Sequence, residues 1–93
     1  MDKSILFTPG KIGPLTLRNR TIRAAAFESM CPGNAPSEQL FNYHTSVAAG
    51  GIGMTNIAYA AVTQSGLSFE RQLWMRPDII PGLRQLTDAI HKE

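Results

Sequence analysis

The sequence predicts an α/β fold in which two buried parallel strands are each followed by a helix. Two runs rich in β-branched and small residues, at 21–27 and 52–62, lie roughly 30 residues apart, the spacing of a βαβ unit. Helical periodicity follows each run, at 37–49 and 77–93. The length of 93 residues allows at most one small domain.

The chain opens with a segment, residues 5–17, that is typical of a β-hairpin or a pair of short strands. Proline-glycine pairs at 9–10 and 13–14 interrupt two short apolar runs, and such pairs mark turns. Two leucines alternate around Thr16, as they do in a half-buried strand. We therefore expect turn-linked strands before the first core strand.

The first βα unit follows. Periodicity alone allows residues 21–27 to be helix or strand, and the short length with flanking turns favours strand. Prolines and a glycine make residues 28–36 a loop. Ser37 is an N-cap and the glycines at 50–51 end the helix. The apolar face of this helix has the i, i+3, i+7 spacing of Leu40, Tyr43 and Val47.

The second βα unit begins at residues 52–62, whose lack of charges predicts a strand that is buried on both faces. A turn at 63–66 and a long loop at 67–76 lead to the helix 77–93. Apolar residues recur along it at i, i+4, i+7 and i+11: Ile79, Leu83, Leu86 and Ile90. Since such strands need neighbours and no strand follows, we expect the pattern to be incomplete.

Composition narrows the class of protein. Cys31 is the single cysteine, which excludes an internal disulfide framework, and two scattered histidines argue against a structural zinc site. We expect a reducing cytoplasm as the compartment, no metal, and no membrane span, because no stretch approaches about 20 apolar residues. The apolar stretch near the start of the chain, residues 5–7, is too short for the apolar region of a signal peptide.

The net charge of +2 gives no general argument for binding nucleic acid or an anionic membrane. Arg18, Arg20 and Arg23 crowd one segment, and the first two would share a face of an extended strand. We favour solvated arginines over a phosphate-binding patch, since no aromatic residues or Gly-Lys loop accompany them.

Several short motifs occur in a characteristic order: residues 6–9 (LFTP), 12–20 (IGPLTLRNR), 43–44 (YH), 50–54 (GGIGM) and 60–66 (AAVTQSG). Their order and spacing resemble the Old Yellow Enzyme family of FMN-dependent, NAD(P)H-linked oxidoreductases, which are (β/α)₈ barrels. The resemblance covers the whole chain. It implies that residues 1–93 are an incomplete, N-terminal segment of one FMN-binding TIM-barrel domain, since such a barrel needs roughly 250 residues.

In such barrels the chemistry lies at the carboxyl ends of the strands. The resemblance implies that Ala24, Ala25, Ala26 and Phe27 lie against the flavin ring and that Tyr59 borders it. Small side chains would let a planar isoalloxazine approach the backbone closely. The alternative is that the alanines simply fit a crowded barrel interior. No catalytic residue is assigned.

The sequence departs from the family pattern in this segment. The family commonly has Pro and Met or Leu where Ala25 and Ala26 stand, and a Thr or Cys where Phe27 stands. That Thr or Cys tunes the flavin through a hydrogen bond, which a phenylalanine cannot donate. Glu28 or Ser29 would replace it only if the loop bends back.

Other chemically notable residues are assigned structural roles. His44 and His91 lie on predicted helices away from the strand ends, so we expect a packed, hydrogen-bonded residue and a helix-dipole partner respectively. Cys31 lies past the matching redox position and is expected to be a buried or idle thiol. Phe69 and Trp74 either roof the substrate or cover the barrel mouth, and the sequence leaves both readings open.

The resemblance implies a parent enzyme that moves hydride from NADH or NADPH to FMN and then to a small molecule, an electron-poor alkene or similar acceptor. The remaining catalytic residues are expected outside this segment, which alone would be inactive and bind FMN weakly. The alternative is a stand-alone α/β interaction module that acts through oligomerisation, so a homo-oligomer stays open. A third reading, a small phosphate or nucleic-acid binder, would use the arginines.

Overall fold

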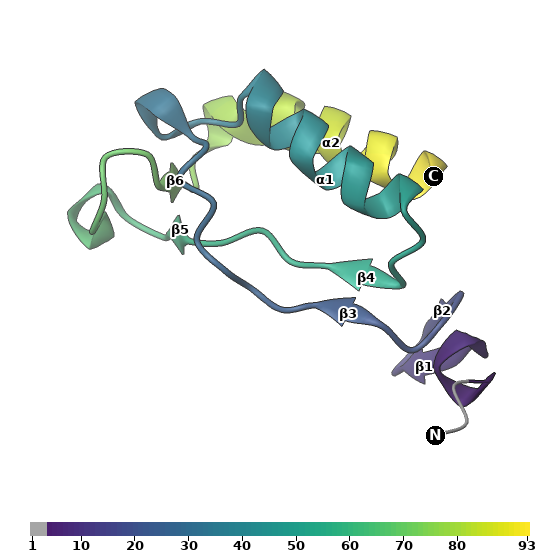
Figure 1. The fold of residues 1–93 in the computed structure, drawn as a ribbon. Coiled ribbons are helices and arrows are strands. Elements are labelled where there is room, and N and C mark those ends of the chain that lie inside the picture. The colour runs from purple at the N-terminus through teal and green to yellow at the C-terminus, as the bar shows by residue number, and fades with distance from the viewer. Residues whose placement is uncertain (1–3) are drawn as a thin grey trace.

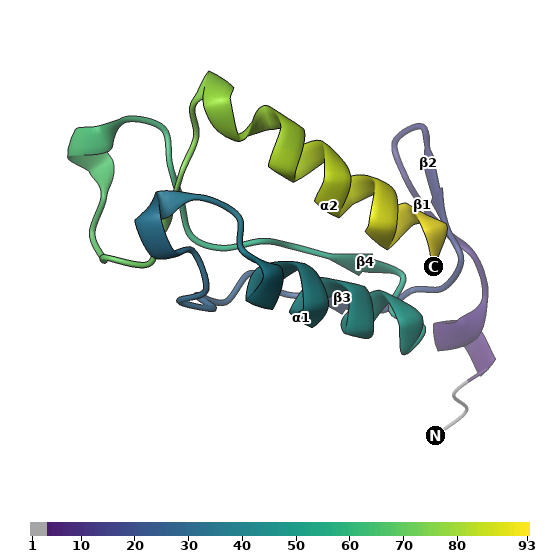
Figure 2. The same ribbon diagram turned by 90° about the horizontal axis from the view of Figure 1, so that it is seen from above.

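The computed structural model describes residues 4–93 and confirms the α/β order of elements. Helices α1 (Glu38–Ala49) and α2 (Ile80–Lys92) lie side by side and cover one side of the strands (Figures 1 and 2). Beneath them β3 (Ile22–Arg23) and β4 (Met54–Thr55) pair in parallel. The predicted parallel pair with a helix between its strands is therefore confirmed.

The N-terminal hairpin is also confirmed. Strands β1 (Gly10–Ile12) and β2 (Leu15–Leu17) are antiparallel, with Ile12 opposite Leu15. Gly13 turns the chain between them with φ +56°, a left-handed conformation that glycine adopts without steric cost.

Residues Ser4–Phe7 form a 3₁₀ helix, η1, where the sequence suggested a strand. The backbone N–H and the hydroxyl of Thr8 both donate to the carbonyl of Ile5, at 3.3 and 2.7 Å. These two bonds close a turn, and the following Pro9 has no N–H with which to extend a strand ladder.

Strand β3 is much shorter than the predicted 21–27. The amide of Asn56 donates to the carbonyl of Arg23 at 3.0 Å, and the guanidinium of Arg23 donates to the carbonyl of Asn56 at 2.7 Å. Two side chains thus occupy backbone groups where the next rungs of the ladder would form. The chain beyond Arg23 leaves the sheet as a consequence.

The predicted strand 52–62 is divided into β4 and β5 (Ala60–Ala61). Strand β5 pairs in parallel with β6 (Leu73–Trp74), which lies inside the predicted loop 67–76. That loop prediction is wrong over these two residues, because a two-residue strand has no periodicity to recognise and is defined by its partner.

The helix termini agree with the sequence. The hydroxyl of Ser37 accepts the N–H of Leu40 at 3.1 Å, and Gly51, with φ +106°, turns the chain after α1. A 3₁₀ turn, η4 (Pro77–Ile79), leads into α2. The loops predicted at 28–36 and 63–66 contain η2 (Pro32–Asn34) and η3 (Gln64–Gly66).

The apolar core lies where α1, α2 and β6 meet. Its buried members are Cys31, Leu40, Leu73, Ile79 and Leu86. Of the predicted inward face, Ile79 in η4 and Leu86 in α2 are buried, and Leu83 and Ile90 are partly buried against this core. Over residues 4–93, no helix combines the length and apolar character needed to cross a membrane.

Candidate functional site at the carboxyl ends of the strands

Parallel pairing places the carboxyl ends of β3 and β4 at one edge of the sheet. The segments that follow, residues 24–28 and 56–59, run side by side from that edge (Figure 1). The N–H of Glu28 donates to the carbonyl of Ala58 at 3.3 Å. The structure therefore brings the two stretches that the sequence singled out next to each other.

Three aromatic rings from this edge form what we call the aromatic wall: Phe27, Tyr59 and Phe69. The Phe27 and Tyr59 rings are stacked, 5.3 Å between centroids and 13° between planes. Phe69 stacks on Phe27 at 4.8 Å and 25°. Tyr59 and Phe69 are each 48% exposed, so the wall is an exposed apolar patch of the kind that marks a ligand or interaction site.

The alanines precede the aromatic wall along the chain. Ala24, Ala25 and Ala26 are all exposed, so their methyl groups and backbone are accessible from outside. Together with the aromatic wall they give the carboxyl edge an apolar surface. Within residues 4–93 they are not crowded by neighbouring side chains.

Phe69 joins the wall whereas Trp74 does not. The indole of Trp74 is half-buried and the guanidinium of Arg76 lies over its ring, 4.6 Å from the centroid. This cation–π contact covers one face of the Trp74 ring. Of the two aromatic residues that the sequence left open, only Phe69 therefore contacts Phe27.

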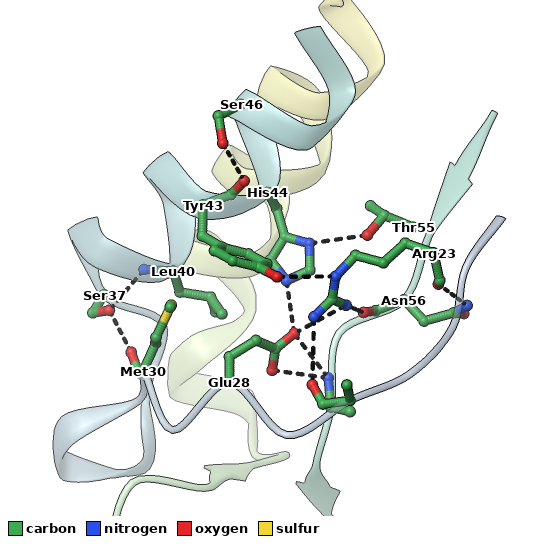
Figure 3. Close-up of polar contacts among 12 residues, drawn as sticks. Arg23, Glu28, Met30, Ser37, Leu40, Tyr43, His44, Ser46, Thr55 and Asn56 are labelled. Atoms are coloured by element: carbon green, nitrogen blue, oxygen red, sulfur yellow. Dashed lines mark hydrogen bonds and ion pairs between the residues drawn. The ribbon is translucent and has the colours of Figure 1, made fainter. Parts of the chain in front are cut away.

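A buried carboxylate, that of Glu28, lies between the segment after β3 and helix α1 (Figure 3). The Glu28 side chain is 2% exposed, and its Oε1 accepts a hydrogen bond from Nε2 of His44 at 2.9 Å. The N–H of Ala58 approaches both carboxylate oxygens, at 3.4 and 3.3 Å. Nη1 of Arg23 is 3.5 Å from Oε1. A buried carboxylate needs such partners, because an unpaired one is strongly disfavoured.

His44 is completely buried in α1 and is hydrogen-bonded at both ring nitrogens. Its Nδ1 lies 3.2 Å from the hydroxyl of Thr55. Because an ionised carboxylate only accepts, we assign the hydrogen on Nε2 to the bond with Glu28. The prediction that His44 is a satisfied interior residue is confirmed. Its pairing with Glu28 was missed, since only the fold brings loop and helix together.

Arg23 connects this network to the surface segment. Its Nε donates to the hydroxyl of Tyr43 at 3.3 Å and its guanidinium lies 5.0 Å from the centre of that ring. Its Nη2 donates to the carbonyl of Ala26 at 3.5 Å. One guanidinium thus spans from α1 to the exposed alanines.

The three arginines do not form the predicted group of solvated strand residues. Arg18 donates through Nε and Nη2 to the carbonyl of Ile52 at 3.1 and 2.9 Å, and through Nη1 to the carbonyl of Glu93 at 2.8 Å. Arg20 donates to the Thr8 hydroxyl at 3.2 Å. Arg18 and Arg20 both lie in the bend between β2 and β3, where they are exposed as expected, and only Arg23 lies in a strand, so the first two do not share a strand face.

The Glu28 carboxylate faces inward, so it does not replace the hydrogen bond that Phe27 cannot make. Ser29 is exposed with φ +57°. Cys31 is 4% exposed, and burial raises the pKa of its thiol to about 11, with a further increase from the Glu28 charge that Arg71 partly offsets. The prediction of a buried thiol is confirmed.

His91 is exposed in the last turn of α2, where a positive charge is favoured by the helix dipole. Among residues 4–93 there is no group of three or more histidine, cysteine or acidic side chains placed to hold a metal ion.

Comparisons with known proteins agree with this architecture. The sequence is 49% identical over 88 residues to a 4,4'-dithiodibutanoate disulfide reductase of Rhodococcus erythropolis. The matched region covers 95% of this chain but 22% of that protein. Morphinone reductase in complex with tetrahydroNAD superposes with a TM-score of 0.84 at 24% identity, over 94% of this chain and 24% of that one.

The Old Yellow Enzyme homologue from Zymomonas mobilis gives a TM-score of 0.83 at 22% identity, with 94% and 24% coverage. The fold is therefore that of the N-terminal part of this group of TIM barrels, as the sequence predicted. The chain spans about a quarter or less of the proteins it matches. The model of the NADH:flavin oxidoreductase / NADH oxidase family matches residues 5–93, and the chain belongs to that family.

Proposed function

We propose that this chain forms the first part of an FMN-binding barrel in an NAD(P)H-dependent oxidoreductase. Residues Ala24, Ala25, Ala26, Phe27 and Tyr59 would line the flavin. The observation that carries the proposal is the exposed apolar surface at the carboxyl ends of β3 and β4, the end at which barrels of this kind hold their ligands.

The residues present fit a flavin. Isoalloxazine is a planar aromatic system with an apolar dimethylbenzene end, and the exposed Tyr59 and Phe69 rings, both stacked on Phe27, offer aromatic surface to it. The exposed alanines carry only a methyl group beyond the backbone, so a ring system can approach the main chain there. Backbone donors, rather than a side chain at Phe27, would make any polar contact from this position.

When bound, FMN would supply two-electron transfer between NADH or NADPH and a second substrate. This chain's residues would keep water from one side of the ring and fix its distance from the backbone. With an electron-poor alkene, NAD(P)H and one proton give the saturated product and NAD(P)⁺. The proposed acceptor is such an alkene, a small molecule.

A second acceptor has specific support. The relative that is 49% identical is named for reducing a disulfide. A disulfide acceptor would take one hydride equivalent and one proton from the same reductants to give two thiols. The aromatic wall does not favour one acceptor over the other, because the C=C bond and the S–S bond are both uncharged.

Anaerobic reduction of the purified full-length protein, of which this chain would form the first part, separates these readings. We expect that protein to retain one FMN after desalting, and we expect the flavin to bleach on addition of NADH or NADPH, whereas residues 1–93 alone are expected to bind FMN weakly. Reoxidation by 2-cyclohexenone would support an alkene acceptor, and reoxidation by 4,4'-dithiodibutanoate would support a disulfide acceptor. A purified full-length protein that carries no flavin and takes up none contradicts the proposed function.

Two further expectations from the sequence stay predictions: a cytoplasmic compartment and the possibility of a homo-oligomer. Light scattering of the purified protein measures the second directly. A discrete assembly of the flavin-free protein, with no reductase activity, would instead support the alternative of an interaction module.

A further inference from the structure

We infer that Glu28 is a positioning residue that sets the separation and the local charge of the two backbone segments at the proposed flavin surface. The inference rests on the proposed function and deepens it. It concerns the pair Glu28 and Arg23, which lies beneath the surface rather than on it.

Geometry supports the role first. Glu28 belongs to the segment after β3, yet it is bonded to Ala58 twice over: its own N–H donates to the Ala58 carbonyl, and the Ala58 N–H donates to its carboxylate. Residues Phe27 and Tyr59 are the immediate neighbours of these two positions. The stacking of their rings therefore depends on this closed pair of contacts.

The network also fixes the alanine segment. Arg23 is 3.5 Å from the Glu28 carboxylate and donates to the carbonyl of Ala26. Its side chain is 15% exposed and that of Glu28 is 2% exposed, so solvent screens the pair weakly. His44 and Tyr43 hold the pair from α1. The groups of residues 4–93 that bond to the carboxylate, on His44, Ala58 and Arg23, are thus all donors.

The charge of Glu28 predicts the direction in which the relative affinity for reduced and oxidised FMN should change. Replacing Glu28 by glutamine removes one negative charge and leaves the Arg23 guanidinium without its counter-ion beside the Ala26 carbonyl. Two-electron reduction of a bound flavin adds negative charge, which an uncompensated guanidinium stabilises. The Glu28→Gln variant is therefore expected to hold reduced FMN more tightly relative to oxidised FMN.

The experiment compares the FMN midpoint potential, the visible flavin spectrum and the FMN dissociation constant in the purified holoprotein and in Glu28→Gln. We expect the potential to rise by about 30 mV, which corresponds to a tenfold change in relative affinity for a two-electron couple. Glu38→Gln is the matched control: Glu38 is exposed in the first turn of α1, and the same substitution there should change none of the three readings.

A purely structural role predicts a different result. In that case Glu28→Gln lowers the melting temperature but leaves potential and spectrum as in the unmodified protein, and the inference is overturned. Tyr43→Phe removes one acceptor of Arg23 without changing charge, and it decides the matter if Glu28→Gln does not fold. We expect it to weaken FMN binding and shift the flavin spectrum. An unchanged FMN dissociation constant and spectrum would overturn the inference.

FMN binding by the unmodified protein distinguishes failure of the proposed function from failure of this inference. If the unmodified protein binds no FMN, both the proposed function and this inference are wrong. If it binds FMN and only the variants behave as merely destabilised proteins, this inference alone is wrong.

Discussion

The two ends of the β3–β4 pair are held by different chemistry. At the amino-terminal end, the guanidinium of Arg18 and the amide of Asn19 donate to backbone carbonyls of Gly51 and Ile52, and the surface there includes the exposed hairpin. At the carboxyl end a buried carboxylate, Glu28, is bonded by donors, and the exposed surface there consists of the aromatic wall and the alanines.

This difference separates stability from function. Donation of a cation to carbonyls near the ends of helices stabilises the fold and requires no buried negative charge. A carboxylate that is 2% exposed is a costly way to hold two loops together, and apolar packing would serve stability as well. We therefore expect changes at the amino-terminal end to alter stability alone and changes at the carboxyl end to alter flavin binding.

The largest effect on stability is expected for Gly53→Ala. A methyl group at Gly53 would lie 2.6 Å from the carbonyl oxygen of Asn19 and 2.8 Å from that of Thr21. Backbone atoms cannot move aside cheaply, so we expect a loss of about 3 kcal/mol in the free energy of unfolding. Urea unfolding of the flavin-free protein measures it, because bound FMN would add to the apparent stability.

Gly66→Ala is the control for that substitution. The added methyl group at Gly66 has its nearest neighbour at 3.5 Å, an ordinary contact, and the residue is exposed. If both variants lose the same stability, the close approach at Gly53 is not the cause.

Arg18→Gln should have an intermediate effect on the free energy of unfolding. Arg18 donates to the carbonyls of Ala48, in the last turn of α1, and of Glu93, just after α2. Both helix ends lose a positive charge in the variant, and we expect a loss of about 1–2 kcal/mol. Arg20→Gln, at an exposed residue bonded to Thr8, should cost less than about 0.5 kcal/mol. Equal losses for the two would contradict the special role of Arg18.

The smallest expected effect concerns the reactivity of the Cys31 thiol. Burial raises the pKa of this thiol from 9.0 to about 11, so at pH 8 it is protonated and unreactive. A thiol-modifying disulfide reagent should react with the native protein far more slowly than with urea-unfolded protein, with Cys31→Ser as the blank. Rapid reaction of the native protein at pH 8 would contradict the buried environment.

The raised pKa of Cys31 also predicts how the stability of the fold depends on pH. Between pH 9 and 11 the unfolded thiol has lost its proton while the folded one retains it, so the unfolded state is favoured as pH rises through that window. The contribution of Cys31 to stability is present in full below pH 9. Replacement by serine should make stability fall less steeply over that range.

The helices were predictable from the sequence because their signals are local. Ser37 and the glycines at 50–51 specify both ends of α1, and periodic apolar residues specify the inward face of α2. The parallel pairing of β3 with β4 followed from their separation along the chain. The resemblance to a flavoenzyme family added the candidate surface residues, which local pattern alone would not identify.

The remaining features depend on tertiary contacts. Strand β6 has two residues and exists because β5 lies beside it. Glu28 and His44 are a loop residue and a helix residue whose bond no spacing rule specifies. The early end of β3 follows from the exchange of side-chain bonds between Arg23 and Asn56. In each case the deciding partner is remote in sequence.

The central claim, that the carboxyl edge lines the flavin, is tested most directly by the FMN dissociation constant of Ala25→Trp. An indole at this exposed position would occupy the space proposed for the ring. We expect FMN binding to weaken at least about tenfold, equivalent to 1.4 kcal/mol, with little change in melting temperature of the flavin-free protein. Ala49→Trp, at an exposed alanine at the end of α1, should leave the constant unchanged. An Ala25→Trp protein that binds FMN as tightly as the unmodified one would contradict the claim.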